Sequence, residues 1–234
     1  MRRKVGFCVP TTTNKRDWKN AEETDLWKVL FNDLENHTPT DCEITCFVGY
    51  DADCKVWKDA EQRMKCNATF TKFKIEWTAF GDEVKGKPTW IWNELAGFAI
   101  SEGFEYLQIL GDDIRLPRDT GWLSCFVNKL KKNRNIGWVA GWSNNNEIPT
   151  QFLIHKTHID IFGWVYPPQI VAWYCDNHMA ELYPKKFSVW LKSFPLLNVG
   201  GSPRYDPQDD TNLYKMLLKR HRPILNRFLQ QMDK

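Results

Sequence analysis

The first half of the chain alternates short apolar runs with longer segments whose apolar residues recur every three or four positions. The short runs, which predict strands, cover 4–9, 43–49, 69–77 and 106–110. The periodic segments between them, which predict helices, cover 17–36, 55–65 and 89–101. Such spacing is typical of a helix that packs one face on a core, whereas short runs bounded by turn residues are typical of strands. This strict alternation predicts an α/β fold with a mostly parallel central sheet flanked by helices.

The second half of the chain is less regular. Helical spacing returns over 122–133, 156–162 and 176–183, and strand-like runs over 136–142, 151–154, 187–191 and 194–199. The last segment, 207–234, interleaves basic residues with leucines. Such a tail is either an amphipathic segment that makes peripheral contact with a membrane surface or a helix docked on its own domain. We favour a docked helix, interrupted at Pro223 because proline breaks helices.

Composition narrows the class of protein. The net charge of +3 over 234 residues is too small and too scattered for a nucleic-acid-binding protein. No run of about 18 apolar residues is present, so we expect no transmembrane segment. The basic start, 1–4, is followed by an apolar run too short for a signal-peptide core. The seven cysteines form no Cys-x-x-Cys pair, so we expect reduced thiols and a cytoplasmic protein.

The motifs of several common sites are absent from the sequence. No Gly-x-Gly-x-x-Gly follows the first predicted strand and no Gly-x-x-x-x-Gly-Lys-Ser/Thr occurs, so neither a dinucleotide fingerprint nor a P-loop is predicted. The chain also lacks a Gly-x-Ser-x-Gly elbow and the His and Cys spacings of zinc sites. The five histidines are scattered, and each is more simply a surface or loop residue than a ligand.

Polar side chains recur instead where predicted strands end. The first strand is followed by the polar loop 11–14, the second by Asp51 and Asp53, and the fourth by Asp112 and Asp113. Loops at the carboxyl ends of parallel strands meet at one edge of the sheet, where α/β proteins bind ligands. Two carboxylates there suit a divalent cation that also holds phosphates. Each loop taken singly is more simply a turn or a helix cap, but their repetition favours a site, with a nucleobase at Asp51.

These segments resemble a known family. The residues that carry the resemblance are Pro10-Thr11-Thr12, the Asp51 loop, Trp92-Asn93-Glu94-Leu95-Ala96 and the segment 106–114. Over 4–206 the chain resembles nucleotide-sugar glycosyltransferases of the GT-A fold (family 2-like). Those enzymes bind a divalent metal and the donor diphosphate with a short Asp-x-Asp-type motif, from which this chain departs at Gly111.

The resemblance implies a cofactor site and a set of donor contacts. It implies a Mn²⁺ or Mg²⁺ site at Asp112 and Asp113, with Asp113 the direct ligand and Asp112 a partner of the ribose, the sugar or the ligand shell. The third metal ligand stays open among His178, Asn198 and His221. Donor-binding residues are expected to be Pro10, Thr11, Thr12, Asp51, Asn93, Asp112 and Arg204. Arg204, in the loop 200–205, either neutralises phosphate charge or is a solvated surface residue.

A second region of resemblance concerns the acceptor. The segment 162–168 is aromatic and contains glycine, and Asp176 stands at the start of the next predicted helix. In similar inverting transferases the acidic residue at this point is the general base for the acceptor hydroxyl, which makes Asp176 the candidate. The alternative is that Asp176 only caps its helix. The aromatic residues Trp164, Tyr166 and Trp173 are candidates for an acceptor platform.

The sequence therefore predicts one GT-A-type domain over 1–234. We expect a donor-binding half over 1–115, an acceptor and catalytic half over 116–206, and a helical tail over 207–234. The expected activity is metal-dependent, inverting transfer of a sugar from a UDP-sugar to a hydroxyl of a glycan or other acceptor. One alternative is a sugar nucleotidyltransferase. Such an enzyme is expected to have a glycine-rich loop after the first strand, and the loop here contains no glycine. Another is a non-enzymatic carbohydrate-binding domain that uses the 12 tryptophans.

Overall fold

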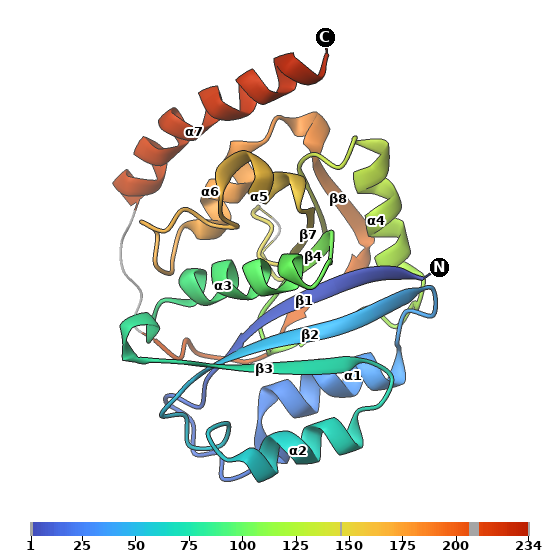
Figure 1. The fold of residues 1–234 in the computed structure, drawn as a ribbon, viewed down its shortest axis with the longest axis vertical. Coiled ribbons are helices and arrows are strands. Elements are labelled where there is room, and N and C mark those ends of the chain that lie inside the picture. Colours follow the sequence, from blue (N-terminus) through green and yellow to red (C-terminus); the bar gives the residue numbers. More distant parts are fainter. Residues whose placement is uncertain (1, 146, 206–210, 234) are drawn as a thin grey trace.

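The computed structural model describes residues 2–145, 147–205 and 211–233, and its centre is a seven-stranded sheet in the order β3-β2-β1-β4-β7-β6-β8 (Figure 1). The strands are β1 Arg3–Thr11, β2 Cys42–Asp51, β3 Lys74–Phe80, β4 Tyr106–Ile109, β6 Trp138–Trp142, β7 Phe152–His155 and β8 Ser188–Pro195. β7 is antiparallel to both of its neighbours, and all other pairs are parallel. The predicted α/β fold with a mostly parallel sheet is confirmed.

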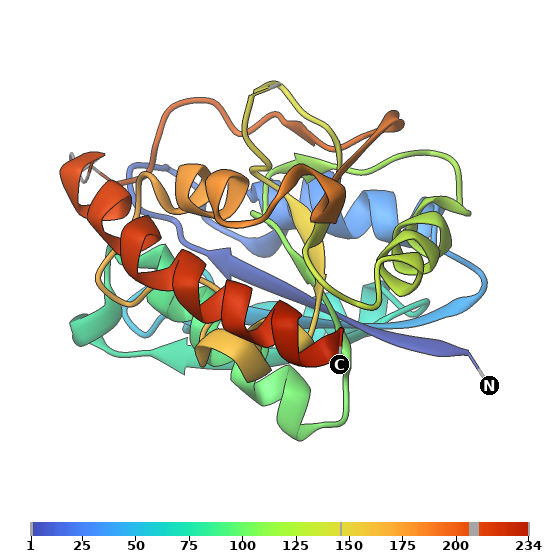
Figure 2. The ribbon, with the colours of Figure 1, turned by 90° about the horizontal axis from the view of Figure 1, so that it is seen from above.

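Helices cover both faces of the sheet (Figure 2). One face carries a π-helical stretch Leu26–Phe31 that continues into α1 Asn32–Asn36, with α2 Ala60–Thr69 and α4 Trp122–Lys132. The other face carries α3 Pro88–Ser101, α5 Thr157–Phe162, α6 Cys175–Leu182 and α7 Thr211–Met232. Short 3-10 turns lie at Ala21–Glu23, Asp82–Val84 and Lys185–Phe187. Because side chains alternate along a strand, β1 sends Phe7 into the first core and Cys8 into the second.

A small second sheet brings the late loop to the end of β4. β5 Ile114–Arg115 pairs antiparallel with β9 Leu197–Asn198, with Asn198 opposite Ile114. The loop that follows β9 therefore starts beside the carboxylates that precede β5.

Three boundaries in the first half differ from the prediction. The segment predicted as a helix over 17–36 is continuously helical only from Leu26. The helix predicted over 55–65 runs instead over Ala60–Thr69, because the Asp59 side chain accepts a hydrogen bond from Glu61 N at 2.9 Å and caps it. The third strand is β3 rather than 69–77, since α2 ends only at Thr69.

The last third of the chain differs in two ways. The predicted strands 187–191 and 194–199 are one long strand, β8, and the short β9. The predicted break at Pro223 is wrong, because α7 continues through this exposed proline. Leu217, Leu218 and Leu225 bury the inner face of α7 in the second core, so the helix docks on its own domain. The predicted start of the tail, at 207, lies outside the described residues.

Two further expectations concern the cysteines and the absence of a transmembrane segment. All seven cysteines are free thiols, and only Cys125 is exposed. Across the described ranges, every helix is too short or too polar to pass through a bilayer.

Candidate active site

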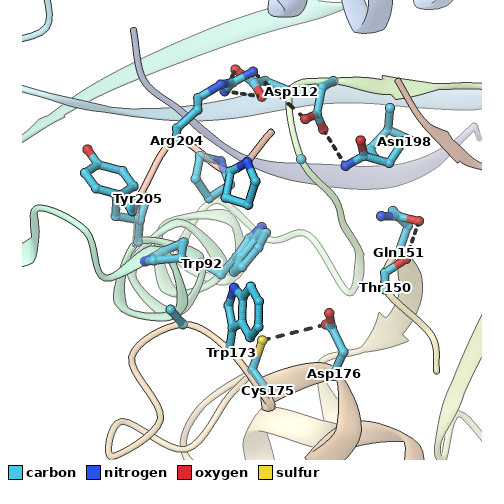
Figure 3. A pocket seen from close by; sticks show the side chains of 18 of the residues that line it. Trp92, Asp112, Thr150, Gln151, Trp173, Cys175, Asp176, Asn198, Arg204 and Tyr205 are labelled. Atoms are coloured by element: carbon cyan, nitrogen blue, oxygen red, sulfur yellow. Dashed lines mark hydrogen bonds and ion pairs between the residues drawn. The ribbon is translucent and has the colours of Figure 1, made fainter. Parts of the chain in front are cut away.

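A cavity of about 720 Å³ lies at the carboxyl ends of β1 and β4, where ligands of open α/β sheets bind. In Figure 3, Asp112, Asn198 and Arg204 lie on one side of it, and Trp173, Cys175 and Asp176 on the other. Its lining includes these residues predicted from the sequence: Pro10, Thr11, Thr12, Asp112, Asp113, Asp176 and Arg204. Its size is that of a small-molecule site.

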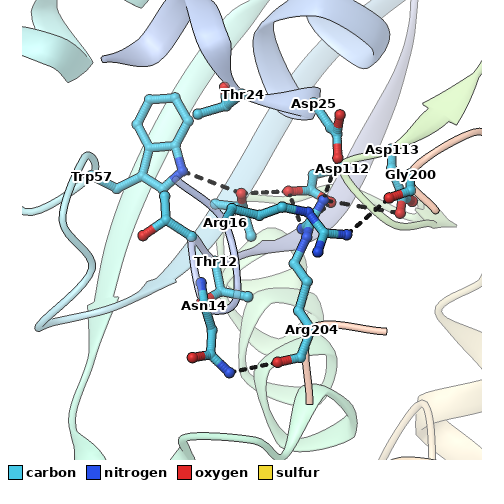
Figure 4. Close-up of polar contacts among 12 residues, drawn as sticks. Thr12, Asn14, Arg16, Thr24, Asp25, Trp57, Asp112, Asp113, Gly200 and Arg204 are labelled. Atoms are coloured by element: carbon cyan, nitrogen blue, oxygen red, sulfur yellow. Dashed lines mark hydrogen bonds and ion pairs between the residues drawn. The ribbon is translucent and has the colours of Figure 1, made fainter. Parts of the chain in front are cut away.

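Asp112 is bound on all sides by protein groups. It is 2% exposed and accepts a hydrogen bond from Thr11 Oγ1 at 2.6 Å. Nη1 of Arg204 donates to both carboxylate oxygens of Asp112, at 2.7 and 2.6 Å (Figure 4). Thr11 in turn accepts from the Trp57 indole at 3.2 Å. These contacts occupy both carboxylate oxygens of Asp112, and Asp112 thereby orients Arg204.

Arg204 is a buried cation shared among carboxylates. Its side chain is 11% exposed, and Nη2 lies 2.8 Å from Asp25 Oδ2 and 4.0 Å from Asp113 Oδ2. The guanidinium also lies over the Trp18 ring, 5.2 Å from its centroid. A buried charge is stable only when it is paired, so this arginine is part of the site and not a solvated surface residue.

Asp113 is the more accessible carboxylate of the pair. Its Oδ1 accepts one hydrogen bond from Asn198 Nδ2 at 3.2 Å. Burial and the neighbouring Asp112 charge raise the pKa of Asp113 to about 6, although Arg204 opposes the shift. A desolvated carboxylate with a raised pKa is stabilised by any cation that reaches it.

The loop 200–205 is fastened to the loop after β1. Nη2 of Arg16 donates to the carbonyls of Gly200 and Ser202 at 2.9 and 2.8 Å, and Asn14 donates to the carbonyl of Arg204. A Cβ on Gly200 would overlap Oδ2 of Asp113. Glycine at 200 therefore lets the loop backbone pass directly over the carboxylate.

Asp51 lies beside the main cavity, in the lining of an adjoining cavity of about 250 Å³. Its Oδ2 accepts hydrogen bonds from Thr12 Oγ1, at 2.7 Å, and from the Tyr205 hydroxyl. No described residue donates a hydrogen bond to its Oδ1. Thr12 lines both cavities and connects them.

Asn93, predicted as a donor contact, has its amide engaged elsewhere. Oδ1 accepts from the backbone N–H groups of Val165 and Tyr166, and Nδ2 donates to the carbonyl of Tyr166, all at 2.9 Å. Its neighbour Trp92 lines the cavity and donates its indole N–H to the carbonyls of Cys8 and Leu110. The side chain of Asn93 thus holds the loop that leads toward Asp176.

Asp176 stands in the first turn of α6 and lines the cavity on the side opposite Asp112 (Figure 3). Its Oδ1 accepts from the Tyr166 hydroxyl at 3.1 Å and contacts Cys175 Sγ at 3.7 Å. Burial raises the pKa of Asp176 to about 7, and the hydrogen bonds from Tyr166 and Cys175 oppose the rise. A carboxylate with this pKa is suited to general base catalysis near neutral pH.

The aromatic and histidine candidates differ in whether they reach the cavity. Trp173 lines the cavity and is 50% exposed, so it offers a ring face to a sugar. Tyr166 is fully buried and offers none, while Trp164 packs against Phe162 and His221. His178 and His221 bond to each other at 3.0 Å, and of the three candidate third ligands only Asn198 lies beside Asp113.

Three site residues were not predicted from the sequence: Arg16, Asp25 and Tyr205. Asp25 precedes the helical stretch at Leu26 and has the sequence signature of a cap, yet its side chain caps nothing and pairs with Arg204. Arg16 and Tyr205 act from loops, where a single sequence carries no periodic signal. The sequence offered Asp25 only as one of several acidic residues that follow the first loop.

The described residues of this site suit a divalent cation that binds together with a ligand. The described residues contain no cluster of three or more His, Cys, Asp or Glu side chains arranged to hold a metal ion. Both oxygens of Asp112 are bound by Arg204, which leaves Asp113 as the available carboxylate of this pair. Magnesium sites that use one or two carboxylates plus substrate phosphates are common, so the residues fit a cation that binds with a diphosphate.

The sequence matches no protein-family model and none of the curated proteins. Its structure is similar to S. aureus TarS, with a TM-score of 0.59, 12% identity, and coverage of 93% of this chain and 39% of that one. It is also similar to the mannosyltransferase PcManGT from Pyrobaculum calidifontis, solved with GDP-Man and Mn²⁺ (TM-score 0.54, 13% identity, 100% and 65% covered). A third similar structure, from Desulfovibrio desulfuricans G20, is described as a nucleotide-diphospho-sugar transferase (TM-score 0.52, 10% identity, 97% and 99% covered).

These similarities, at 10 to 13% identity, establish the fold. The chain has the GT-A-type α/β fold that its sequence resemblance predicts. It spans less than two thirds of the TarS and PcManGT chains.

Proposed function

We propose that this chain is a glycosyltransferase that moves a sugar from a nucleoside-diphosphate donor, of the UDP-sugar class, to a hydroxyl of a glycan or other acceptor. The observation that carries the proposal is that Asp113 and Asp176 line one cavity. The first is suited to a cation and diphosphate, and the second to a base. The fold shared with sugar-transferase structures supports the assignment.

The donor is proposed to lie along the ends of β1, β2 and β4. Asp51 Oδ1 would accept an N–H of the nucleobase, and Pro10, Thr11 and Thr12 would line the ribose and phosphates. Arg204, held by Asp112, places a fixed positive charge beside the diphosphate. A fixed guanidinium costs no reorganisation when charge develops on a leaving group.

Asp113, with Asn198 beside it, would hold Mn²⁺ or Mg²⁺ together with the donor phosphates. The cation would supply Lewis-acid stabilisation of the charge on the leaving diphosphate. Because one carboxylate of the Asp112–Asp113 pair is available, we expect the free protein to bind the metal weakly until a nucleotide is present.

The proposed chemical step is a single inverting displacement. Asp176 takes the proton of the acceptor hydroxyl through Oδ2, to which no described residue donates a hydrogen bond. The acceptor oxygen forms its bond to the anomeric carbon as the bond from that carbon to the diphosphate oxygen breaks. Trp173 is placed to pack against the acceptor sugar.

Replacing the proposed base tests this function. Asp176→Asn should lower the rate of nucleotide release from UDP-sugars by about 10²- to 10⁴-fold, the usual contribution of a general base, while nucleotide affinity is retained. The measurement is UDP release with a panel of sugar acceptors, with Asp160→Asn as the control because Asp160 is an exposed α5 carboxylate outside the cavity. An Asp176→Asn protein that turns over at the normal rate would contradict the assignment.

A further inference from the structure

Beneath the proposed base lies a tyrosine that no ligand can touch. Tyr166 is fully buried, and its hydroxyl donates to Oδ1 of Asp176 at 3.1 Å. Burial and the nearby Asp176 raise the pKa of the Tyr166 phenol far above its ordinary value. The hydroxyl therefore keeps its proton near neutral pH and donates it to the carboxylate in a hydrogen bond.

The backbone of Tyr166 is itself fixed from α3. The Asn93 side chain makes three hydrogen bonds of 2.9 Å to the main chain of Val165 and Tyr166. An amide side chain can accept two N–H bonds through its oxygen and donate one to a carbonyl through its nitrogen, which neither an ionised carboxylate nor an apolar side chain can do. The Trp92 and Phe152 rings pack against the Tyr166 ring, with centroids 5.5 and 5.9 Å away. This packing holds the phenol so that its hydroxyl points toward Asp176.

The two oxygens of Asp176 consequently have different surroundings. Oδ1 faces the protein and is engaged by Tyr166 and, more weakly, by Cys175 of α6 itself. Oδ2 receives no hydrogen bond from any described residue, and Asp176 lines the cavity. The titratable groups that act on Asp176 are these same two, Tyr166 and Cys175.

We propose that Tyr166 is a positioning residue for Asp176: its hydroxyl, aimed by Asn93, holds Oδ1 so that Oδ2 faces the acceptor hydroxyl. This inference rests on the proposed function of Asp176 as the base. A hydrogen bond to an ionised carboxylate also favours the charged form. Tyr166 therefore both orients the base and extends its working range to lower pH.

The test is the pH dependence of kcat/KM for Tyr166→Phe, a change that removes one oxygen atom. A carboxylate base acts when deprotonated, so the wild-type rate should fall as pH drops through about 7. Without the phenol the pKa of Asp176 rises, and the midpoint of the acid limb should move upward by about one pH unit. The rate loss is therefore larger at pH 6 than at pH 9, and nucleotide affinity should not change.

The matched control is Tyr183→Phe. Tyr183 is also buried, and its hydroxyl bonds to His158 Nδ1 at 2.6 Å rather than to Asp176. It should lower the melting temperature in the manner of Tyr166→Phe and leave the pH midpoint in place. In an Asp176→Asn background, Tyr166→Phe should change the residual rate by less than about twofold, because coupled residues do not act independently.

The outcomes distinguish the positioning role of Tyr166 from the proposed function on which it rests. A wild-type protein that transfers no sugar, or an Asp176→Asn protein with a normal rate, contradicts the proposed function. An active wild type that loses its rate in Asp176→Asn but keeps its pH midpoint in folded Tyr166→Phe overturns the positioning role alone. If Tyr166→Phe does not fold, Asn93→Ala, which frees the Tyr166 backbone, should give the same upward shift of the midpoint, and an unshifted midpoint would overturn the role.

Discussion

Asp112 and Asp113 are neighbours in the sequence but have different surroundings in the structure. Asp112 is enclosed by Thr11 and Arg204, whereas Asp113 has, among the described residues, a single side-chain hydrogen-bond donor in Asn198. The difference arises because consecutive residues at the end of β4 point in different directions. One carboxylate can therefore fix a cationic side chain while the other stays available to a ligand.

The close passage of Gly200 over Asp113 gives a prediction at the scale of a single atom. Gly200→Ala would place a methyl group on Oδ2 of Asp113, so the carboxylate has to move. We expect metal-dependent nucleotide affinity to fall by at least tenfold, with little change in the free energy of unfolding, measured by titration calorimetry and denaturant unfolding.

Gly97→Ala is the matched control for that substitution. Gly97 lies on α3, and a Cβ there meets no atom within 4 Å. Alanine in a helix interior is more stable than glycine by about 0.5–1 kcal/mol. Gly97→Ala should therefore gain stability and bind nucleotide normally. Equal affinity in the two variants would show that Gly200 has no special relation to Asp113.

At the residue scale, the sequence could indicate which side chains take part in a site but not which residues those side chains contact. The adjacent carboxylates after an apolar strand marked Asp112 and Asp113, and the start of a helix after an aromatic segment marked Asp176. The pairing of Arg204 with Asp25 joins residues 179 positions apart, and no periodic pattern encodes such a contact. Asn93 was predicted as a donor contact, and its three backbone contacts depend on a loop that sequence reasoning could not place.

At the scale of elements, α7 shows how packing overrides local propensity. Proline lacks an N–H and clashes with the preceding turn, which costs about 3 kcal/mol in a helix interior. α7 nevertheless continues through Pro223 because Leu217, Leu218 and Leu225, on both sides of it, are buried in the domain. The proline itself lies on the exposed face.

This conflict predicts a stabilising substitution. Pro223→Ala should raise the free energy of unfolding by about 1–3 kcal/mol, less the entropy that proline removes from the unfolded chain. For a domain of this size, each kcal/mol raises the melting temperature by about 2–4 °C. Asn226→Ala, an exposed change in the same helix, should stay within about 0.5 kcal/mol of wild type. A destabilised Pro223→Ala protein would contradict the continuous helix.

Element order was predictable and element boundaries were less so. The sheet and the helices over Pro88–Ser101 and Trp122–Lys132 follow from hydrophobic spacing, because their buried residues recur at regular intervals. The start of α2 was missed because Trp57 is fully buried from a turn rather than from a helix. Apolar residues in a buried turn carry the same composition signal as those in a helix, and only the Asp59 cap distinguishes them.

At the scale of the whole molecule, the cavity joins the two halves of the chain. The carboxylates at the ends of the parallel strands come from the first half, and Asp176, Trp173 and the loop that carries Arg204 come from the second. The small β5–β9 sheet, which pairs Ile114 with Asn198, connects them. This arrangement brings the proposed donor and acceptor sides into one open cavity.

The central claim is that this cavity binds a nucleoside diphosphate through Asp113 and a divalent cation. Calorimetric titration with UDP, UDP-glucose and GDP, each with and without Mn²⁺, tests it most directly. We expect one nucleotide to bind with Mn²⁺ at least tenfold more tightly than without it, and this gain to be lost in Asp113→Ala but kept in Asp160→Ala. Absence of nucleotide binding under every metal condition, or an unchanged metal effect in Asp113→Ala, would contradict the account.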